Sequence, residues 1–247
     1  MKQYEAVIQT IESLGGIATL NQINHSIFDI KDCCWNTQTP FASIRRIVQT
    51  TKGIYRVKPG LYALESYRDN LEKNGIVVQT EENKDSDEVK VFTHSYYQGL
   101  LLEIGKLRHF DTFVPKQDKN KRFLTQSLGS ISTLGNIPHY SFNNLVERSS
   151  TIDVIWFNKN QMPDSFFEIE HSTDIQNSLL KFNDLQDFYV RMVIVADGRR
   201  FNEFKTKMKY DAFDRLCKNN RVAFLSYESL DKQYEQELQK QSFEFVV

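Results

Sequence analysis

The chain has 247 residues and a mass of 29.0 kDa, which is enough for one large domain or two modest ones. Its 40% hydrophobic and 26% charged residues exclude a disordered or fibrous protein, and its net charge of −1 argues against non-specific coating of nucleic acid. No apolar run approaches the roughly 18 residues that cross a bilayer, and no signal peptide is recognisable. Because three cysteines cannot form a disulfide framework, we expect a reducing, cytoplasmic location with no membrane partner.

Residues 1–66 have the pattern of three helices followed by a hairpin. A first apolar stripe ends at Gly15, and a short second helix follows, with Thr19 as its expected N-cap. The third helix is expected to begin at Pro40, because proline suits the first helical position. Two short strands, 53–57 and 61–64, flank a tight turn. The order predicts a small independent domain.

This segment resembles the winged helix-turn-helix domains that are often fused to bacterial DNA-acting enzymes. The resemblance implies that the third helix lies in the DNA major groove while the wing contacts phosphates. The residues so implied are Ser43, Arg45, Arg46, Gln49, Arg56 and Lys58. Seven Lys or Arg against five Asp or Glu give residues 1–66 a net charge of about +2, in keeping with DNA contact. Winged helices also serve as protein–protein modules, so that alternative stays open.

An acidic, aperiodic segment at 67–90 predicts a solvated linker, and residues 91–247 then have an α/β pattern. A helix is expected from near His94, ending at Gly105. Two β-type runs at 152–157 and 166–170 precede a further helix and a fully apolar strand. The apolar strand, Met192 to Ala196, is typical of a buried parallel strand. We therefore predict an α/β fold with a mixed sheet, preceded by the small first domain.

Three acidic residues lie in the two β-type runs. Asp153 is in the first run, and Glu168 and Glu170 are in the second. Residues two apart in a strand project to the same face, about 6.5 Å apart, so the two glutamates should be neighbours. At that distance two carboxylates repel by ~2 to 3 kcal/mol at an effective dielectric near 20. A divalent cation would relieve the repulsion, and oxygen ligands favour Mg²⁺, with Mn²⁺ as a substitute.

The placement of these acids on two strands, before a helix and an apolar strand, resembles the PD-(D/E)XK nuclease superfamily, to which many type II restriction endonucleases belong. The resemblance covers about 94–230 and implies that Asp153, Glu168 and the main-chain carbonyl of Ile169 ligate the metal. It also implies a helical acid at the metal site, for which Glu103 is the candidate. The sequence departs from the family at Glu170, which stands where lysine is usual.

Glu170 is expected to act as the general base or to bind a second ion, as Glu does at this position in a minority of restriction enzymes. An alternative, ranked lower, is that Lys181 on the next helix supplies the missing amine. A basic rim for DNA is expected from Lys119, Lys121 and Arg122. No glycine-rich phosphate loop with Lys-Ser or Lys-Thr occurs, so no nucleotide cofactor is expected.

The sequence thus favours a magnesium-dependent type II restriction endonuclease that hydrolyses phosphodiesters in duplex DNA. Cleavage of both strands at a palindrome would favour a two-fold homodimer. One alternative is a winged-helix regulator whose nuclease-like domain is inactive. The other is a broader nuclease in phage defence, including one that acts on RNA.

Overall fold

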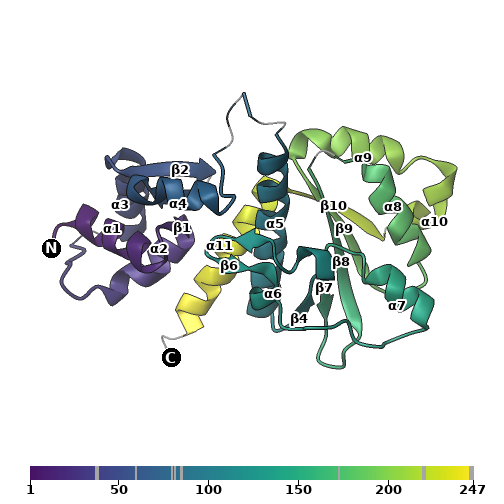
Figure 1. Cartoon of the computed structure of the whole chain (residues 1–247). Helices are drawn as coiled ribbons and strands as arrows, with labels where there is room; N and C mark the ends of the chain where they lie inside the picture. Colours follow the sequence, from purple (N-terminus) through teal and green to yellow (C-terminus); the bar gives the residue numbers. More distant parts are fainter. Residues whose placement is uncertain are drawn as a thin grey trace. The chain divides into compact units, whose positions relative to one another are not determined.

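The fold is described from a computed structural model over residues 1–36, 39–58, 60–78, 80, 82–83, 86–171, 173–218 and 221–244. The chain forms two compact units, one of Met1–Phe92 with the residues from Leu238 onward, and one of Thr93–Glu237 (Figure 1). Within the described ranges, no helix combines the length and the hydropathy needed to span a bilayer.

The first unit contains short helices and a small antiparallel sheet. Its elements are α1 (Gln3–Ser13), β1 (Ile17–Thr19), α2 (Leu20–Ser26), α3 (Pro40–Thr50), β2 (Ile54–Lys58), β3 (Leu61–Leu64) and α4 (Arg68–Lys73). The strand order is β1-β3-β2, so β1 adds a third strand that the sequence patterns did not predict. Helix α4 lies within the segment 67–90 that was expected to be a linker without regular structure.

Capping and apolar periodicity account for these helices. Thr19 caps α2 as predicted, because its hydroxyl accepts the Gln22 N–H at 3.1 Å while the Gln22 side chain accepts the Thr19 N–H at 2.8 Å. Ile11, Ile23 and Ile44, one from each of the first three helices, are fully buried in one cluster. The first unit therefore has a hydrophobic core of its own.

The second unit is built on a five-stranded mixed sheet. Its strands and helices are α5 (Asp87–Leu107), β4 (Asp111–Phe113), β5 (Arg122–Phe123), β6 (Gln126–Ser127), α6 (Leu128–Ile131), α7 (Asn143–Ser149), β7 (Val154–Phe157), β8 (Pro163–Glu170), α8 (Ile175–Asp184), β9 (Arg191–Ala196), α9 (Phe201–Lys207), α10 (Asp214–Lys218), β10 (Val222–Ser226) and α11 (Tyr227–Glu244). Helix α5 begins in the first unit, and α11 ends there. The strand order is β10-β9-β8-β7-β4.

The α/β fold is confirmed, and β8 is the strand at which the sheet changes direction. It pairs antiparallel with β7 and parallel with β9, and β9 in turn pairs parallel with β10. The apolar run predicted as a buried parallel strand is β9. Strand β4, which the sequence patterns did not predict, pairs antiparallel with β7 at the edge of the sheet. The carboxyl ends of β8 and β9 therefore lie beside the start of β7.

Helices cover both faces of this sheet (Figure 1). Leu179 and Phe182 of α8 pack with Phe166 and Ile194 on one face. On the other face the Trp156 indole N–H donates to the main-chain oxygen of Leu101 in α5, at 3.0 Å. The sheet is therefore buried on both sides, and polar groups in its central strands need partners inside the protein.

The helix from near His94 was expected to end at Gly105. It does not, because α5 continues to Leu107. A Cβ built at Gly105 would lie 2.5 Å from Thr112 Cγ2 and 2.7 Å from Trp156 Nε1. The glycine is required for the close approach of the helix to the sheet and not for a positive φ. The prediction that Gly105 ends the helix is therefore wrong.

Candidate active site

The pairing of β7 with β8 brings two of the predicted acids together. Val154 pairs with Phe167 in an antiparallel register, and one step further the same register places Asp153 opposite Glu168. Directly opposed residues project from the same face of an antiparallel pair. Glu168 is therefore in β8, Asp153 is the residue directly before β7, and their carboxyl groups lie at one end of the sheet.

Glu168 is buried and paired with a lysine. It is 2% exposed, and its two carboxylate oxygens lie 3.0 and 2.8 Å from Lys181 Nζ. The Ser178 hydroxyl oxygen lies 2.8 Å from the same carboxylate, and its single hydrogen is shared between this carboxylate and that of Glu170. Burial and the neighbouring Asp153 charge raise the pKa of Glu168 to about 8, against the opposing effects of Lys181 and Ser178. The site thus holds more negative charge than its buried surroundings stabilise.

Glu170 projects from the same face of β8, as its spacing predicted, and its carboxylate shares the Ser178 hydroxyl with Glu168. The hydroxyls of Ser178 and Thr173 both donate to it. Arg200 fixes the following turn, because its guanidinium donates to the main-chain oxygens of Glu170 at 2.9 Å and of Thr173 at 2.6 Å. Burial raises the pKa of Glu170, and the two hydroxyl hydrogen bonds partly offset that effect.

Asp153 is held by groups from two elements. One carboxylate oxygen accepts the main-chain N–H of Ile169 at 2.8 Å and lies 3.2 Å from His94 Nε2 on α5. Burial raises the pKa of the Asp153 carboxyl, but its charge interaction and hydrogen bond with His94 outweigh burial and hold the pKa below its usual value. Asp153 is therefore ionised beside a buried glutamate.

The helical acid predicted for this cluster lies elsewhere. Glu103 pairs with Lys106 at 2.7 Å on α5, and no contact of Glu103 with Asp153, Glu168 or Glu170 is found in the described ranges. Across those same ranges, no three His, Cys, Asp or Glu side chains are grouped closely enough to form a metal site on their own. Helix α5 contributes His94 to the cluster, more than two turns before Glu103.

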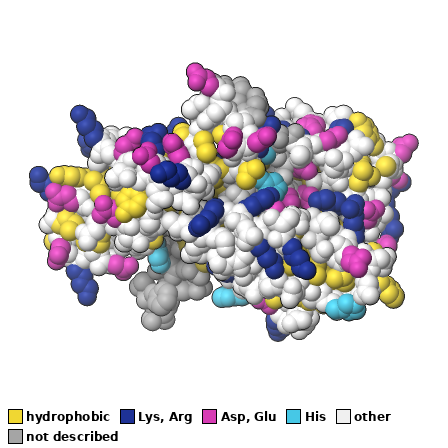
Figure 2. Space-filling model, viewed as in Figure 1, with side chains coloured by type: hydrophobic (Ala, Val, Ile, Leu, Met, Phe, Trp, Pro, Cys, Tyr) yellow, Lys and Arg dark blue, Asp and Glu magenta, His cyan; other side chains and the backbone are white. Residues whose placement is uncertain are grey.

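The expected basic rim of the second unit is partly engaged in local contacts. Lys121 pairs with the buried Asp118 at 2.6 Å, and Lys119 donates to the main-chain oxygen of Gly135. Arg122 is exposed and donates to the main-chain oxygen of Thr125 at 3.2 Å. Figure 2 shows Lys and Arg side chains gathered on the viewed face of this unit, with acidic side chains among them.

The residues predicted to contact DNA from the first unit differ in exposure. Arg45, Arg46 and Gln49 on α3 are exposed, and Ser43 is half-buried. Arg56 on β2 is exposed. Lys58 is buried, with its Nζ 5.3 Å from the centre of the Phe92 ring, so its burial removes it from the surface where a phosphate contact was expected.

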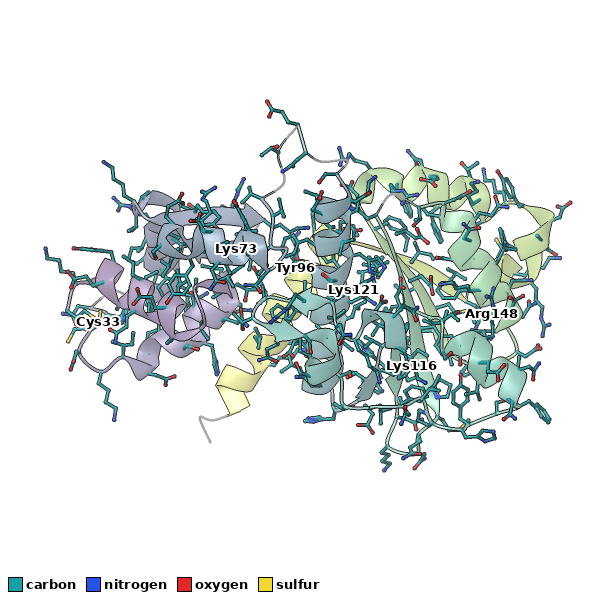
Figure 3. The ribbon with its side chains drawn as sticks, viewed as in Figure 1. Cys33, Lys73, Tyr96, Lys116, Lys121 and Arg148 are labelled. Carbon is teal, nitrogen blue, oxygen red and sulfur yellow. The ribbon has the colours of Figure 1, made fainter. Side chains whose placement is uncertain are left out.

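Sequence reasoning missed three polar residues of the cluster. Ser178 hydrogen-bonds both glutamates, and His94 and Gln98 on α5 contact Asp153. A signal was present, since His94 and Gln98 stand four residues apart on a helix that is otherwise apolar near its middle. A polar pair at that spacing inside a buried helix calls for buried partners. Lys121, which pairs with the Asp118 carboxylate that Gln98 contacts, is labelled in Figure 3.

Comparison with known proteins identifies the family. Residues 76–246 match the model of the C-terminal domain of type II restriction enzyme NmeDI, and the chain belongs to this family. It is 28% identical over 151 residues to the type II restriction enzyme NmeDI of Neisseria meningitidis serogroup C, a match that covers 57% of this chain and 42% of that protein. The chain therefore spans less than half the length of this relative. No solved structure matches the chain.

Proposed function

We propose that the chain is a magnesium-dependent restriction endonuclease that hydrolyses a phosphodiester bond in duplex DNA. The observation that carries the proposal is the opposition of Asp153 and Glu168 across β7 and β8, with Lys181 on α8 against the same carboxylate. Membership of the NmeDI C-terminal domain family supports the same reaction class. The similarity of the arrangement to PD-(D/E)XK nucleases supports it further.

The residues present fit a hard divalent cation. Both acids are oxygen donors, and the raised pKa of Glu168 indicates uncompensated negative charge that a dication would relieve. Asp153 and Glu168, with the main-chain carbonyl of Ile169, would hold the ion. When bound, Mg²⁺ or Mn²⁺ supplies an activated water and charge stabilisation for the phosphate. Glu103 is not part of this proposal, because it pairs with Lys106.

The contacts favour Lys181 over Glu170 as the residue that acts on the attacking water or the phosphate. Lys181 Nζ lies on the Glu168 carboxylate, and a quarter of its side chain is exposed. An ammonium group at this place can donate to a phosphate oxygen and offset the charge that develops on it. The Glu170 carboxylate is hydrogen-bonded to Ser178 and Thr173. In this proposal Glu170 therefore holds α8 in place beside the site.

Incubation of the pure protein with varied duplex DNA and Mg²⁺ tests the proposal. The wild type should give discrete fragments, and Glu168→Gln and Asp153→Asn should abolish cleavage. Lys181→Met should lower the cleavage rate by at least 100-fold, within the range that positioned electrostatic groups contribute. Lys159→Ala, at an exposed lysine in the turn between β7 and β8, is the matched control and should cleave normally.

Other results would favour the alternatives. Intact DNA across many substrates, with binding unchanged in a chelator, would indicate an inactive nuclease-like regulator. If Glu170→Gln lowers the cleavage rate as far as Lys181→Met does, Glu170 is the residue that acts on the attacking water, as the sequence first indicated. Preferential cleavage of RNA, or fragments without defined ends, would indicate a broader defence nuclease.

The first unit is proposed to be a winged-helix DNA-binding domain. Its order of elements, α1-β1-α2-α3-β2-β3 with β2 and β3 paired antiparallel, supports this interpretation, as do the exposed Arg45 and Arg46 on α3. Palindromic cleavage would further require a two-fold homodimer on DNA. Sedimentation equilibrium in a chelator, with and without duplex DNA, should then give a complex whose mass equals two chains plus one duplex.

A further inference from the structure

A polar pair lies in the middle of the apolar helix α5, outside the residues so far given a role in the reaction. Gln98 is fully buried, and His94 is half-buried one turn earlier. A buried amide without hydrogen bonds is strongly unfavourable, so the partners of Gln98 indicate which groups it holds in place.

The contacts of Gln98 fix the direction of its amide. Its Nε2 lies 2.8 Å from the Asp118 carboxylate and 3.0 Å from the main-chain oxygen of Asp153. An amide nitrogen carries two hydrogens, and both are used on these acceptors. The reverse orientation would set the amide oxygen against two oxygen acceptors. The Gln98 oxygen therefore faces His94 Nδ1, at 3.1 Å, and His94 must donate from that nitrogen.

The other nitrogen of His94 also faces an acceptor. Nε2 lies 3.2 Å from the Asp153 carboxylate oxygen that accepts the Ile169 N–H. The pair on α5 thus contacts Asp153 at two points, the carboxylate through His94 and the main-chain carbonyl through Gln98. Among the described residues, no hydrogen bond reaches the second carboxylate oxygen of Asp153.

Asp118 anchors the far end of this chain of contacts. It is 3% exposed and pairs with Lys121 at 2.6 Å, in the segment that follows β4. The polar contacts therefore run without interruption from Lys121 through Asp118, Gln98 and His94 to Asp153. Such a chain, in which each member has a partner, rigidifies the group at its end.

We propose that His94 and Gln98 are positioning residues that hold Asp153 at two points and leave its second carboxylate oxygen available to a divalent cation. This inference rests on the proposed function. In this proposal α5 contributes hydrogen-bond donors to a metal ligand and does not supply a further acid. Glu103 pairs instead with Lys106 on the same helix. Outer contacts of this kind typically change metal affinity by about 10- to 100-fold when removed.

The test is titration calorimetry of the full chain with Mg²⁺ in the absence of DNA. Wild-type binding that Asp153→Asn removes establishes the reference. His94→Leu and Gln98→Leu should weaken Mg²⁺ about 10- to 100-fold. His94→Gln keeps a donor near the position of Nε2 and should recover part of the affinity, while the shorter His94→Asn should not. Far-ultraviolet circular dichroism and the melting temperature identify variants that fail to fold.

The outcomes separate the two proposals. Wild-type affinity in folded His94→Leu and His94→Gln variants would overturn the positioning role and leave the endonuclease proposal intact. Equal weakening in His94→Gln and His94→Asn would also overturn it, because a packing role does not depend on where a donor lies. A wild type without Asp153-dependent Mg²⁺ binding would overturn the proposed function and the positioning role together.

Discussion

The two acids of the candidate site, Asp153 and Glu168, lie in different surroundings, and these affect the pKa of each carboxyl group in opposite directions. Asp153 is stabilised by His94 and the Ile169 N–H, whereas Glu168 is buried beside it with Lys181 and Ser178. Burial and the adjacent negative charge favour protonation of Glu168, and the lysine opposes it. One acid of the pair is therefore a stable anion, while the other gains and loses its proton near neutral pH.

This difference predicts a pH-dependent stability of the metal-free protein. The folded-state pKa of Glu168 is about 8, against an ordinary value of 4.5, so between these values the folded state holds a proton that the unfolded state has lost. The contribution of Glu168 is then fully present below pH 4.5 and lost as the pH rises through 8, with a slope of at most ~1.4 kcal/mol per pH unit.

Urea unfolding of the wild type and of Glu168→Gln in a chelator, at several pH values from 5 to 8, measures this effect. The difference in unfolding free energy between the two proteins should change with pH in favour of the variant at the alkaline end, because glutamine does not titrate. Glu12→Gln, at an exposed glutamate on α1, should follow the wild type. Parallel curves for the wild type and Glu168→Gln would contradict the prediction.

At the level of elements, β8 determines the site because it pairs antiparallel on one side and parallel on the other. The spacing of Glu168 and Glu170 and the apolar run of β9 were readable from the sequence, since alternation and burial leave periodic patterns. The spacing of His94 and Gln98 indicated buried partners for α5, but not which ones, because the apolar stripe of a helix does not say which strand the helix covers. Only the fold brings His94 beside Asp153, 59 residues away.

The close packing of α5 on the sheet predicts the sign of the change in unfolding free energy on Gly105→Ala. In an exposed helix interior, Gly→Ala stabilises by up to ~1 kcal/mol. Gly105→Ala should instead destabilise by about 1 to 3 kcal/mol, because the added methyl would press on Thr112 and Trp156. Thermal or urea unfolding measures the change. Gly135→Ala is the control, since a Cβ there meets nothing within 4 Å. A Gly105→Ala variant more stable than the wild type would contradict this account of the packing.

At the scale of the whole molecule, a net charge of −1 leaves DNA binding to local groups of cations. The exposed cations of α3 lie in the first unit, and the proposed chemistry lies in the second. Binding and cleavage should therefore be separable by substitution. The sequence predicted only in part which cations are free to bind DNA. The burial of Lys58 and the pairing of Lys121 with Asp118 depend on tertiary contacts.

Joint substitution of Arg45 and Arg46 by alanine should weaken duplex binding and lower the slope of log affinity against log salt by about 1 to 2. The cleavage rate at saturating DNA should stay within a few-fold of the wild type. Fluorescence anisotropy in a series of salt concentrations gives the slope. The control removes the same charge elsewhere, through Lys159→Ala with Lys209→Ala at two exposed positions. An unchanged slope of log affinity against log salt in the arginine variant would contradict the prediction that α3 contacts DNA.

The pairing of β7 with β8 is regular near the acids and irregular near the connecting turn. Val154 and Ile155 pair in step with Phe167 and Phe166, but the register shifts between Trp156 and Phe157. β8 thus has one extra residue near the turn that connects the two strands. At the other end of the pair, beside the acids, the register is unchanged. Insertions or deletions at the turn can be accommodated there without rotating either acid to the opposite side, so loop length and chemistry are free to vary independently.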